Sequence, residues 1–152
     1  MKVNIKTYLT KNAAWDDNLA GGLFHLIAGH YRAPTHLKPR SPEEVNPPCF
    51  VVEDDKGRLV GVTFFKPITG HLVETYSTVI AKDWRGKGIG TKLNDYIEEE
   101  LRKHGYGKIT CNVYTSNLPS LVLKLKRGYL IEGTLMDHDF KGMHEYVLGK
   151  KL

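Results

Sequence analysis

The sequence predicts a single α/β domain over residues 1–152, built on a mixed and mostly antiparallel sheet flanked by helices. Three observations predict this class. Short segments rich in alternating or β-branched residues recur along the chain. Three of them follow one another in its middle with only turns between them, which favours antiparallel neighbours. Two helical segments then separate strands in the second half, and such crossovers predict parallel pairing around the strand at Lys108–Tyr114.

The first third of the chain is expected to hold a strand, a helix and a long loop. Alternating polar and apolar residues predict the strand at Lys2–Leu9. Apolar residues repeat at helical spacing from Leu19 to Ile27, after an aspartate that can cap a helix. Prolines then break any long helix between Arg32 and Pro48, where one short helix can start at Ser41.

The rest of the chain is expected to alternate strands with two helices. Ile89, Leu93, Ile97 and Leu101 lie four apart, which predicts a helix at Thr91–His104. The expected strands are Phe50–Glu53, Arg58–Phe65, His71–Ile80, Lys108–Tyr114, Tyr129–Met136 and His144–Gly149, the last two forming a hairpin. A second helix is expected at Leu118–Lys126, capped by Asn117 or Ser116, with Pro119 in its first turn.

Composition is that of a globular protein, with 41% hydrophobic and 26% charged residues. No apolar run is long enough to cross a membrane, and the N-terminus lacks the apolar core of a signal peptide. Cys49 and Cys111 stand far apart, so we expect reduced core cysteines in a cytoplasmic protein. Neither the cysteines nor the seven histidines show metal-ligand spacing, and no metal site is expected.

The chain is basic, with a formal net charge of +5. This balance favours polyanionic partners, either nucleic acid or a cofactor with several phosphates. The same excess also occurs on proteins with neither partner, so charge alone does not decide. No basic stripe is interleaved with aromatic residues, which makes nucleic acid the least favoured partner.

The most specific feature is a glycine-rich turn between a strand and a helix, Arg85-Gly86-Lys87-Gly88-Ile89-Gly90. The first turn of a helix carries N–H groups without intrahelical partners, and the helix dipole adds positive charge there. Glycines allow the backbone to approach an anion closely. Arg85, Lys87 and Lys92 add formal charge, so the segment predicts a phosphate cradle. A tight turn without a ligand is the alternative.

Two common nucleotide motifs do not fit this turn. The glycine spacing differs from the Gly-x-Gly-x-x-Gly of dinucleotide-binding folds. The mononucleotide P-loop fails too, because no Gly-Lys-Ser/Thr follows a four-residue gap.

The sequence here resembles the GNAT superfamily of N-acetyltransferases. The family's pyrophosphate loop reads Arg/Gln-x-x-Gly-x-Gly/Ala, which Arg85, Gly88 and Gly90 match. The resemblance extends to the order of elements, to Asn117 at the start of the later helix and to Gly128-Tyr129 after it. It implies an acyltransferase that uses acetyl-CoA as co-substrate, and a homodimer, because family members often dimerise.

The resemblance also assigns the residues that would hold acetyl-CoA. The pyrophosphate would bind the backbone N–H groups of Gly86, Lys87, Gly88, Ile89, Gly90 and Thr91, with Arg85 opening the loop. The pantetheine arm would pair with Thr78, Val79 and Ile80 as an added strand, and Asn117 would lie near that arm. The N–H of Ile80 matches the family's oxyanion donor.

Two residues are candidates for proton transfer. Glu74 would be the base: it lies six residues before Ile80, so a regular strand places both on one face together with Tyr76 and Thr78. A solvent-facing glutamate is the alternative. Lys124 stands where the family usually has a tyrosine as acid. It could donate a proton, bind a cofactor phosphate or lie in solvent. Tyr129 and Tyr146 are weaker substitutes, expected to pack in the core.

The expected function is transfer of an acetyl group from acetyl-CoA to a primary amine by direct attack in a ternary complex. The acceptor, a small molecule or a peptide, would contact Arg32–Pro48, Glu74, Tyr76 and the last hairpin. His138 and His144 in that hairpin could contact it too, but surface histidines are the favoured interpretation. Glu43, Glu44 and Glu74 favour a cationic acceptor. Because Lys124 replaces the usual tyrosine, a module that binds an acyl-CoA without turnover is the second reading.

Overall fold

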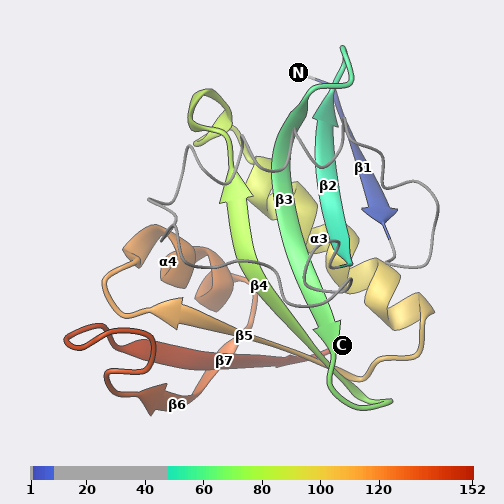
Figure 1. Ribbon diagram of the computed structural model, residues 1–152. Coiled ribbons are helices and arrows are strands. Elements are labelled where there is room, and N and C mark those ends of the chain that lie inside the picture. The colour runs from blue at the N-terminus through green and yellow to red at the C-terminus, as the bar shows by residue number, and fades with distance from the viewer. Residues whose placement is uncertain (1, 9–47) are drawn as a thin grey trace, which may run out of the picture. The chain divides into compact units, whose positions relative to one another are not determined.

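The computed structural model describes residues 2–8 and 48–152 (Figure 1). The helix expected from Leu19 to Ile27 and the proline-rich segment up to Pro47 lie outside the described residues, as do Glu43 and Glu44. Within the described residues, every predicted helix and strand is present, with bounds that differ from the prediction by at most two residues.

The described elements are seven strands, two α-helices and a short 3₁₀ helix that the sequence did not predict. The strands are β1 (Val3–Tyr8), β2 (Cys49–Asp54), β3 (Leu59–Pro67), β4 (Leu72–Ile80), β5 (Lys108–Tyr114), β6 (Leu130–Leu135) and β7 (Glu145–Lys151). The helices are η1 (Lys82–Trp84), α3 (Ile89–Lys103) and α4 (Leu118–Lys126).

The strands form one sheet in the order β1-β2-β3-β4-β5-β7-β6. β4 pairs with β5 in parallel, whereas the β1–β2, β2–β3, β5–β7 and β6–β7 pairs are antiparallel. The prediction of a mixed, mostly antiparallel sheet is therefore confirmed.

The prediction of parallel pairing on both sides of β5 is wrong for the second crossover. The chain does cross from β5 through α4 to β6, but β7 returns from the hairpin and pairs with β5 itself. β6 is thereby left at the edge of the sheet, antiparallel to β7. The hairpin partner has taken the place that a crossover strand usually fills, which local periodicity cannot reveal.

The described chain divides into two compact units, and β4 and α3 run through both. The first unit comprises residues 1–66 and 77–96, and the second comprises residues 67–76 and 97–152. The division within β4 falls at Ser77, whose φ of 48° interrupts the extended backbone. The regular alternation assumed from Glu74 to Ile80 therefore does not hold across Ser77.

The core of the first unit is centred on the ring of Phe50. Its centroid lies 4.7 Å from that of Phe65 and 6.1 Å from that of Tyr96, which it meets edge to face. The hydroxyl groups of Tyr96 and Thr7 lie 3.4 Å apart, so α3 also contacts β1. Each large side chain buried in this way contributes roughly 1.5–3 kcal/mol.

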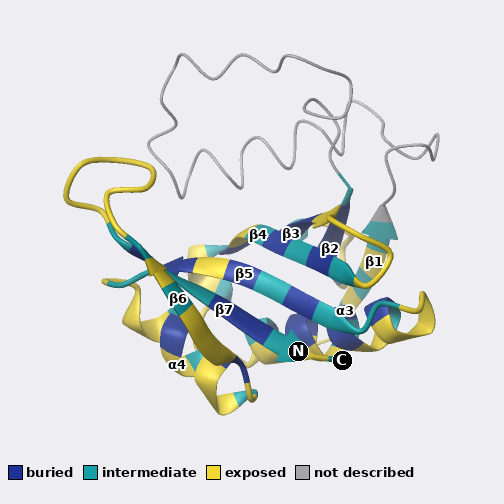
Figure 2. Ribbon diagram, turned by 90° about the horizontal axis from the view of Figure 1, so that it is seen from below, coloured by how far each residue is buried: buried dark blue, intermediate teal, exposed yellow. Residues whose placement is uncertain are grey.

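The second unit combines an apolar core with a buried charge. Val73, Ile109, Tyr129 and Leu148 are fully buried on neighbouring elements. In Figure 2, β5 and β7 carry buried residues, while β6 at the edge is largely exposed. The exposed side of β6 includes Leu130.

Glu98 on α3 is one of the buried charged residues of this unit, and its side chain is only 4% exposed. Its carboxylate accepts hydrogen bonds from Arg127 at 3.3 Å and from Lys150 at 2.6 Å, and Arg102 lies at 3.4 Å. This carboxylate ties the segment after α4 and the end of β7 to α3.

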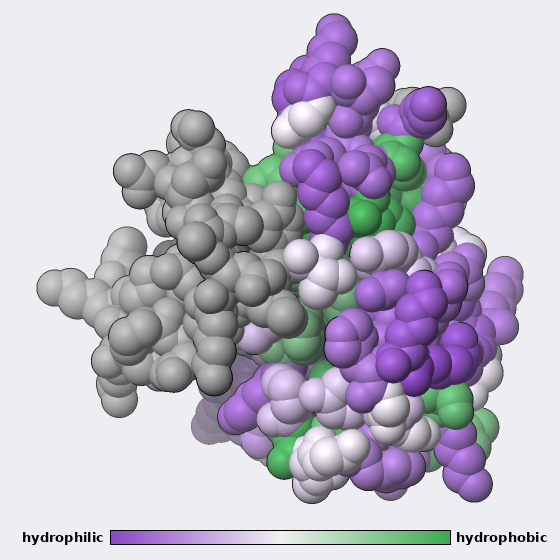
Figure 3. Space-filling view, turned by 90° about the vertical axis from the view of Figure 1, so that its right-hand side faces the viewer, coloured by the Kyte–Doolittle hydropathy of each residue, from purple (hydrophilic) through white to green (hydrophobic). Residues whose placement is uncertain are grey.

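The predicted core cysteines are confirmed, since both are free and buried, Cys49 on β2 and Cys111 on β5. Burial raises the pKa of the Cys49 thiol to about 12. Among the described helices, none combines the length and apolarity that a membrane crossing needs. Hydrophilic side chains cover most of the described surface on the face in Figure 3.

Replacing Glu98 by glutamine should destabilise the protein by about 3 kcal/mol, because the cationic groups around it would lose their counter-charge. Urea denaturation would measure this loss. Glu99→Gln is the matched control, because that side chain is 64% exposed and pairs with Lys103. It should change stability by less than about 0.5 kcal/mol. Equal midpoints for the two variants would contradict the role assigned to Glu98.

Candidate functional site

The turn between β4 and α3 takes its shape from two of its three glycines. Gly86 has a φ of 70° and Gly88 a φ of 75°, both in the left-handed region that other residues rarely adopt. A Cβ added at either residue would meet nothing within 4 Å, so the backbone here faces open space. Gly90 instead lies in the first turn of α3.

The start of α3 is suited to an anion. Lys92 N donates to Gly88 O at 3.1 Å, so the N–H groups of the residues just before Lys92 precede the first helical bond. No acidic residue lies in the first turn. Asn94 donates to Gly90 O at 2.7 Å, which supports that turn from the buried side. The geometry fits the predicted phosphate cradle.

The two basic side chains of the turn also have structural contacts. The Nε of Arg85 donates to Ile80 O at 2.8 Å, which closes the turn back onto the end of β4. The ammonium of Lys87 lies 5.8 Å from the centroid of the Trp84 ring, in the range of a cation–π contact. Both basic residues remain exposed, so their charge still acts on the space above the turn.

The end of β4 is held against β3. Thr63 donates to the hydroxyl of Thr78 at 3.0 Å, and Ala81 N donates to Val60 O at 2.9 Å. Val79 is buried, so its side chain packs in the core. A Cβ at Gly61 would lie 2.9 Å from the Cδ1 of Ile80, which explains the need for glycine there. Residues 78–80 thus form a fixed stretch just before the turn.

Glu74 lies where the parallel pairing of β4 and β5 ends. Leu72, Val73 and Glu74 pair with residues 108–110, and Glu74 and Thr110 form the last pair. Both strands continue beyond that point, β4 to Ile80 and β5 to Tyr114. Glu74 is half-buried there, and its charge acts on Cys111 and Glu145.

Asn117 is the cap of α4, which resolves the choice between it and Ser116. Its side-chain oxygen accepts from Ser120 N at 3.4 Å, and a proline follows in the first turn as predicted. The side-chain carbonyl of Asn117 is therefore engaged with the helix.

Lys124 is buried, so the alternative that places it in solvent is wrong. It is 6% exposed, and its ammonium lies 4.6 Å from the centroid of the Tyr129 ring. Burial lowers the pKa of Lys124, with smaller opposing effects from Cys111 and Glu98 and further lowering by Arg127 and Lys150. Lys124 lies three residues after the buried Leu121, on the same face of α4, although the lysines and the arginine around it suggested an exposed position.

Tyr129 packs in the core, as predicted. It is 1% exposed, and its hydroxyl has no hydrogen-bond partner among the described residues. Burial, together with the charges of Cys111 and Glu98, raises the pKa of this phenol. The tyrosine is therefore held in its neutral form.

Sequence reasoning missed a second buried glutamate, Glu145, at the start of β7. It is 7% exposed and accepts a hydrogen bond from Asn112 Nδ2 at 3.2 Å. Burial and then the charge of Asp139 raise the pKa of Glu145; the hydrogen bond from Asn112 and the charge of His138 lower it, and Glu74 raises it further. Only the long-range pairing of β5 with β7 brings these residues together.

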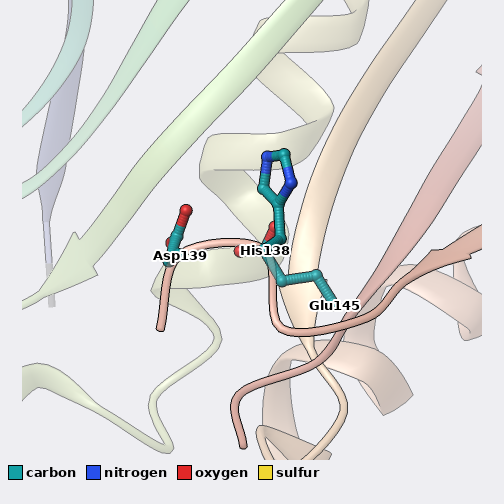
Figure 4. Close-up of side chains that lie close together, drawn as sticks. All are labelled: His138, Asp139 and Glu145. Atoms are coloured by element: carbon teal, nitrogen blue, oxygen red, sulfur yellow. The ribbon is translucent and has the colours of Figure 1, made fainter. Parts of the chain in front are cut away.

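Figure 4 shows His138 and Asp139 of the β6–β7 loop beside Glu145. A ring nitrogen of His138 and one carboxylate oxygen each of Asp139 and Glu145 all lie within 4.8 Å of one another. Tyr114 donates to Asp139 Oδ2 at 2.6 Å. Of the two histidines favoured as surface residues, His138 is exposed and belongs to this cluster, whereas His144 is half-buried and accepts from Asp137 N at 3.1 Å within the loop.

Known proteins are similar to this chain in sequence and in fold. The sequence model for the acetyltransferase (GNAT) family matches residues 11–129. Among solved structures, the fold is similar to that of an Escherichia coli ribosomal-protein-S18-alanine N-acetyltransferase, with 14% identity, a TM-score of 0.75 and coverage of 99% of this chain and 94% of that one. No match was found among curated proteins.

Two further solved structures share the fold. One is an acetyltransferase of the GNAT family from Streptococcus pneumoniae, with 20% identity, a TM-score of 0.75 and 99% coverage of both chains. The other is a Salmonella typhimurium protein solved with its cofactor acetyl-CoA, with 16% identity, a TM-score of 0.72 and coverage of 100% of this chain and 95% of that one.

Replacing Lys124 by methionine should stabilise the protein by about 1 kcal/mol at neutral pH, because the buried charge is removed at similar volume. Below its lowered pKa, protonation of Lys124 opposes folding in full. The cost falls steadily as pH rises from there towards the ordinary value of 10.5, and it is absent above that value. The advantage of the variant should therefore shrink with rising pH.

Urea denaturation at neutral pH and at about pH 10 would measure this difference. Lys126→Met is the matched control, because Lys126 lies on the same helix and is exposed. A control that changed as much as Lys124→Met, or an advantage that grew with pH, would contradict the assignment.

Proposed function

Because this chain belongs to the GNAT family of acetyltransferases, we propose that it transfers the acetyl group of acetyl-CoA to a primary amine by direct attack in a ternary complex. The observation that carries this proposal is the turn before α3. Two left-handed glycines expose the backbone to open space at a helix start that has no acidic residue. This is the arrangement that a pyrophosphate requires.

The first unit would bind the cofactor. Backbone N–H groups of residues 86–91 would hold the pyrophosphate, with Arg85 and Lys87 adding charge. Thr78, Val79 and Ile80 would bind the pantetheine arm through their backbone, and the contacts of this stretch with β3 keep it in place. Acetyl-CoA supplies a thioester whose carbonyl carbon is open to attack, and the N–H of Ile80 would polarise that carbonyl.

The second unit would move the protons. An ammonium group must lose one proton before it can attack, and Glu74 would receive that proton, directly or through water. The C–N bond then forms and the C–S bond breaks, while the nitrogen loses a second proton. Lys124 would supply a proton to the leaving thiolate, so that one proton is released overall. Asn117 would lie near the arm of the cofactor as the cap of α4.

Acyl-CoA binding without turnover is the second candidate. One observation favours it: the ammonium of Lys124 lies against the ring of Tyr129 inside the core rather than in solvent. A single-turnover assay with labelled acetyl-CoA and a set of amines separates the two candidates. Label transferred to any amine would establish turnover, whereas tight binding without transfer would favour a sensor.

Gly88→Glu should abolish detectable binding of acetyl-CoA, because the side chain adds bulk and negative charge where the pyrophosphate would lie. Isothermal titration with acetyl-CoA would measure the affinity. Gly57→Glu is the matched control: Gly57 has a φ of 74° and equally open surroundings, but lies in the β2–β3 turn. It carries the same backbone strain, so unchanged affinity for Gly88→Glu would refute the cradle.

Glu74→Gln should lower kcat by about a hundredfold, as expected for loss of a general base, and leave acetyl-CoA affinity intact. The ascending limb of the pH–rate profile should change as well. Glu99→Gln should retain the parent's rate and profile. If Glu74→Gln retained the parent's pH profile, the base would lie elsewhere.

A further inference from the structure

Arg85 opens the glycine-rich turn, but its side chain bonds to the strand that precedes the turn. Its Nε donates to the carbonyl oxygen of Ile80, the last residue of β4, at 2.8 Å. The short helix η1 lies between the two residues. The hydrogen bond therefore closes a small loop over η1 and ties the end of β4 to the start of the turn. Strand ends open more easily than strand centres, so a tie at this point restricts the backbone.

The peptide group that Arg85 contacts is bonded at both ends. The N–H of Ala81 belongs to the same peptide group as the carbonyl of Ile80, and it donates to Val60 O on β3 at 2.9 Å. The N–H and C=O of one trans peptide group point in opposite directions. The carbonyl of Ile80 therefore points away from β3, and Arg85 bonds it from that side. Two hydrogen bonds from opposite sides fix the plane of this peptide group.

The N–H of Ile80 points to the same side as its carbonyl, because both groups of one residue in a strand lie on the same edge. It therefore points away from β3 as well. The neighbour of β4 on its other edge is β5, and pairing with β5 ends at Glu74. The backbone of Ile80 thus presents its N–H beyond the paired part of β4, beside the carbonyl that Arg85 holds.

Arg85 brings two separable properties to this position. The first is its positive charge, which Lys87 also brings to the turn. The second is an N–H donor at Nε, which lysine lacks, because its only side-chain nitrogen lies one bond further from Cα. The contact uses Nε and ends on a neutral carbonyl, so the donor is the property that acts on Ile80.

We propose that Arg85 is a positioning residue: its hydrogen bond to Ile80 O holds the end of β4 so that the N–H of Ile80 meets the carbonyl oxygen of bound acetyl-CoA. This inference rests on the proposed function, in which that N–H polarises the thioester carbonyl. The oxygen gains negative charge as the amine attacks, and a donor stabilises it only when the donor is already oriented towards it. The charge of Arg85 adds to the turn but does not set this orientation.

Arg85→Gln and Arg85→Lys separate the two properties. Glutamine carries an amide N–H as many bonds from Cα as Nε and has no charge, whereas lysine keeps the charge without that donor. With saturating acetyl-CoA and the best acceptor of the single-turnover assay, kcat should stay within about twofold of the parent in Arg85→Gln. It should fall about three- to tenfold in Arg85→Lys, the range expected for loss of one hydrogen bond.

The infrared stretch of the thioester carbonyl, in acetyl-CoA labelled with ¹³C at that carbon, measures polarisation without turnover. Its frequency should lie below that of the free cofactor in the parent and in Arg85→Gln, and should move back towards the free value in Arg85→Lys. Lys82→Gln removes a charge from the exposed part of η1 and is the matched control, which should keep the parent's frequency and kcat. Equal effects of the two Arg85 variants, or a lysine variant closer to the parent, would overturn the proposal.

Amide hydrogen exchange of Ala81, followed by NMR in the protein alone, tests the tie without any cofactor. Exchange should be about three- to tenfold faster in Arg85→Lys than in Arg85→Gln, and equal exchange would overturn the proposal. If no amine were acetylated but the carbonyl frequencies followed the expected order, the transferase function would fail and the role of Arg85 would stand. Active variants with equal rates would overturn that role and leave the transferase function standing.

Discussion

Parallel pairing between β4 and β5 ends at Glu74 and Thr110, and the arrangement of the candidate site in the second unit depends on that point. Beyond that last pair, β4 and β5 no longer pair with each other. Asn112 and Tyr114 lie on the continuing part of β5 and donate to Glu145 and Asp139. The antiparallel pairing of β5 with β7 keeps the register, since Tyr114 lies opposite Glu145. One parallel and one antiparallel partner of β5 thus define where the polar groups converge.

The two buried glutamates of the second unit, Glu98 and Glu145, have different hydrogen-bond partners and neighbouring charges. Glu98 is surrounded by cationic groups whose hydrogen bonds tie β7 and the segment after α4 to α3. Among the described residues, Glu145 accepts a hydrogen bond from the neutral amide of Asn112; burial and then the charge of Asp139 raise its pKa, while Asn112 and His138 lower it. The first arrangement satisfies the charge with cations, whereas among the described residues no lysine or arginine pairs with the second.

Local patterns were sufficient for the described strands and α-helices, but not for the short helix η1, for long-range pairing or for side-chain surroundings. Four-residue spacing located the buried face of α3, and the glycine-rich turn located the start of that helix. The insertion of β7 between β5 and β6 depends on competition between distant strands, which no local pattern encodes. The positive φ of Ser77 gave no signal because the residue is not glycine. Glu145 was missed for the same reason as β7, since its partners come from β5.

The choice between Lys124 and Tyr129 as proton donor follows from how their shared surroundings act on each. A general acid is most effective when its pKa lies near the pH at which the enzyme works. Burial lowers the pKa of Lys124 from its ordinary value of 10.5, so its ammonium gives up a proton more readily. The same burial raises the pKa of Tyr129, so its phenol gives up a proton less readily. Burial destabilises the charged form of each group, which is the protonated form of lysine and the deprotonated form of tyrosine. The same surroundings therefore lower the pKa of the lysine and raise the pKa of the tyrosine. The lysine therefore matches the proposed role better than the tyrosine against which it packs.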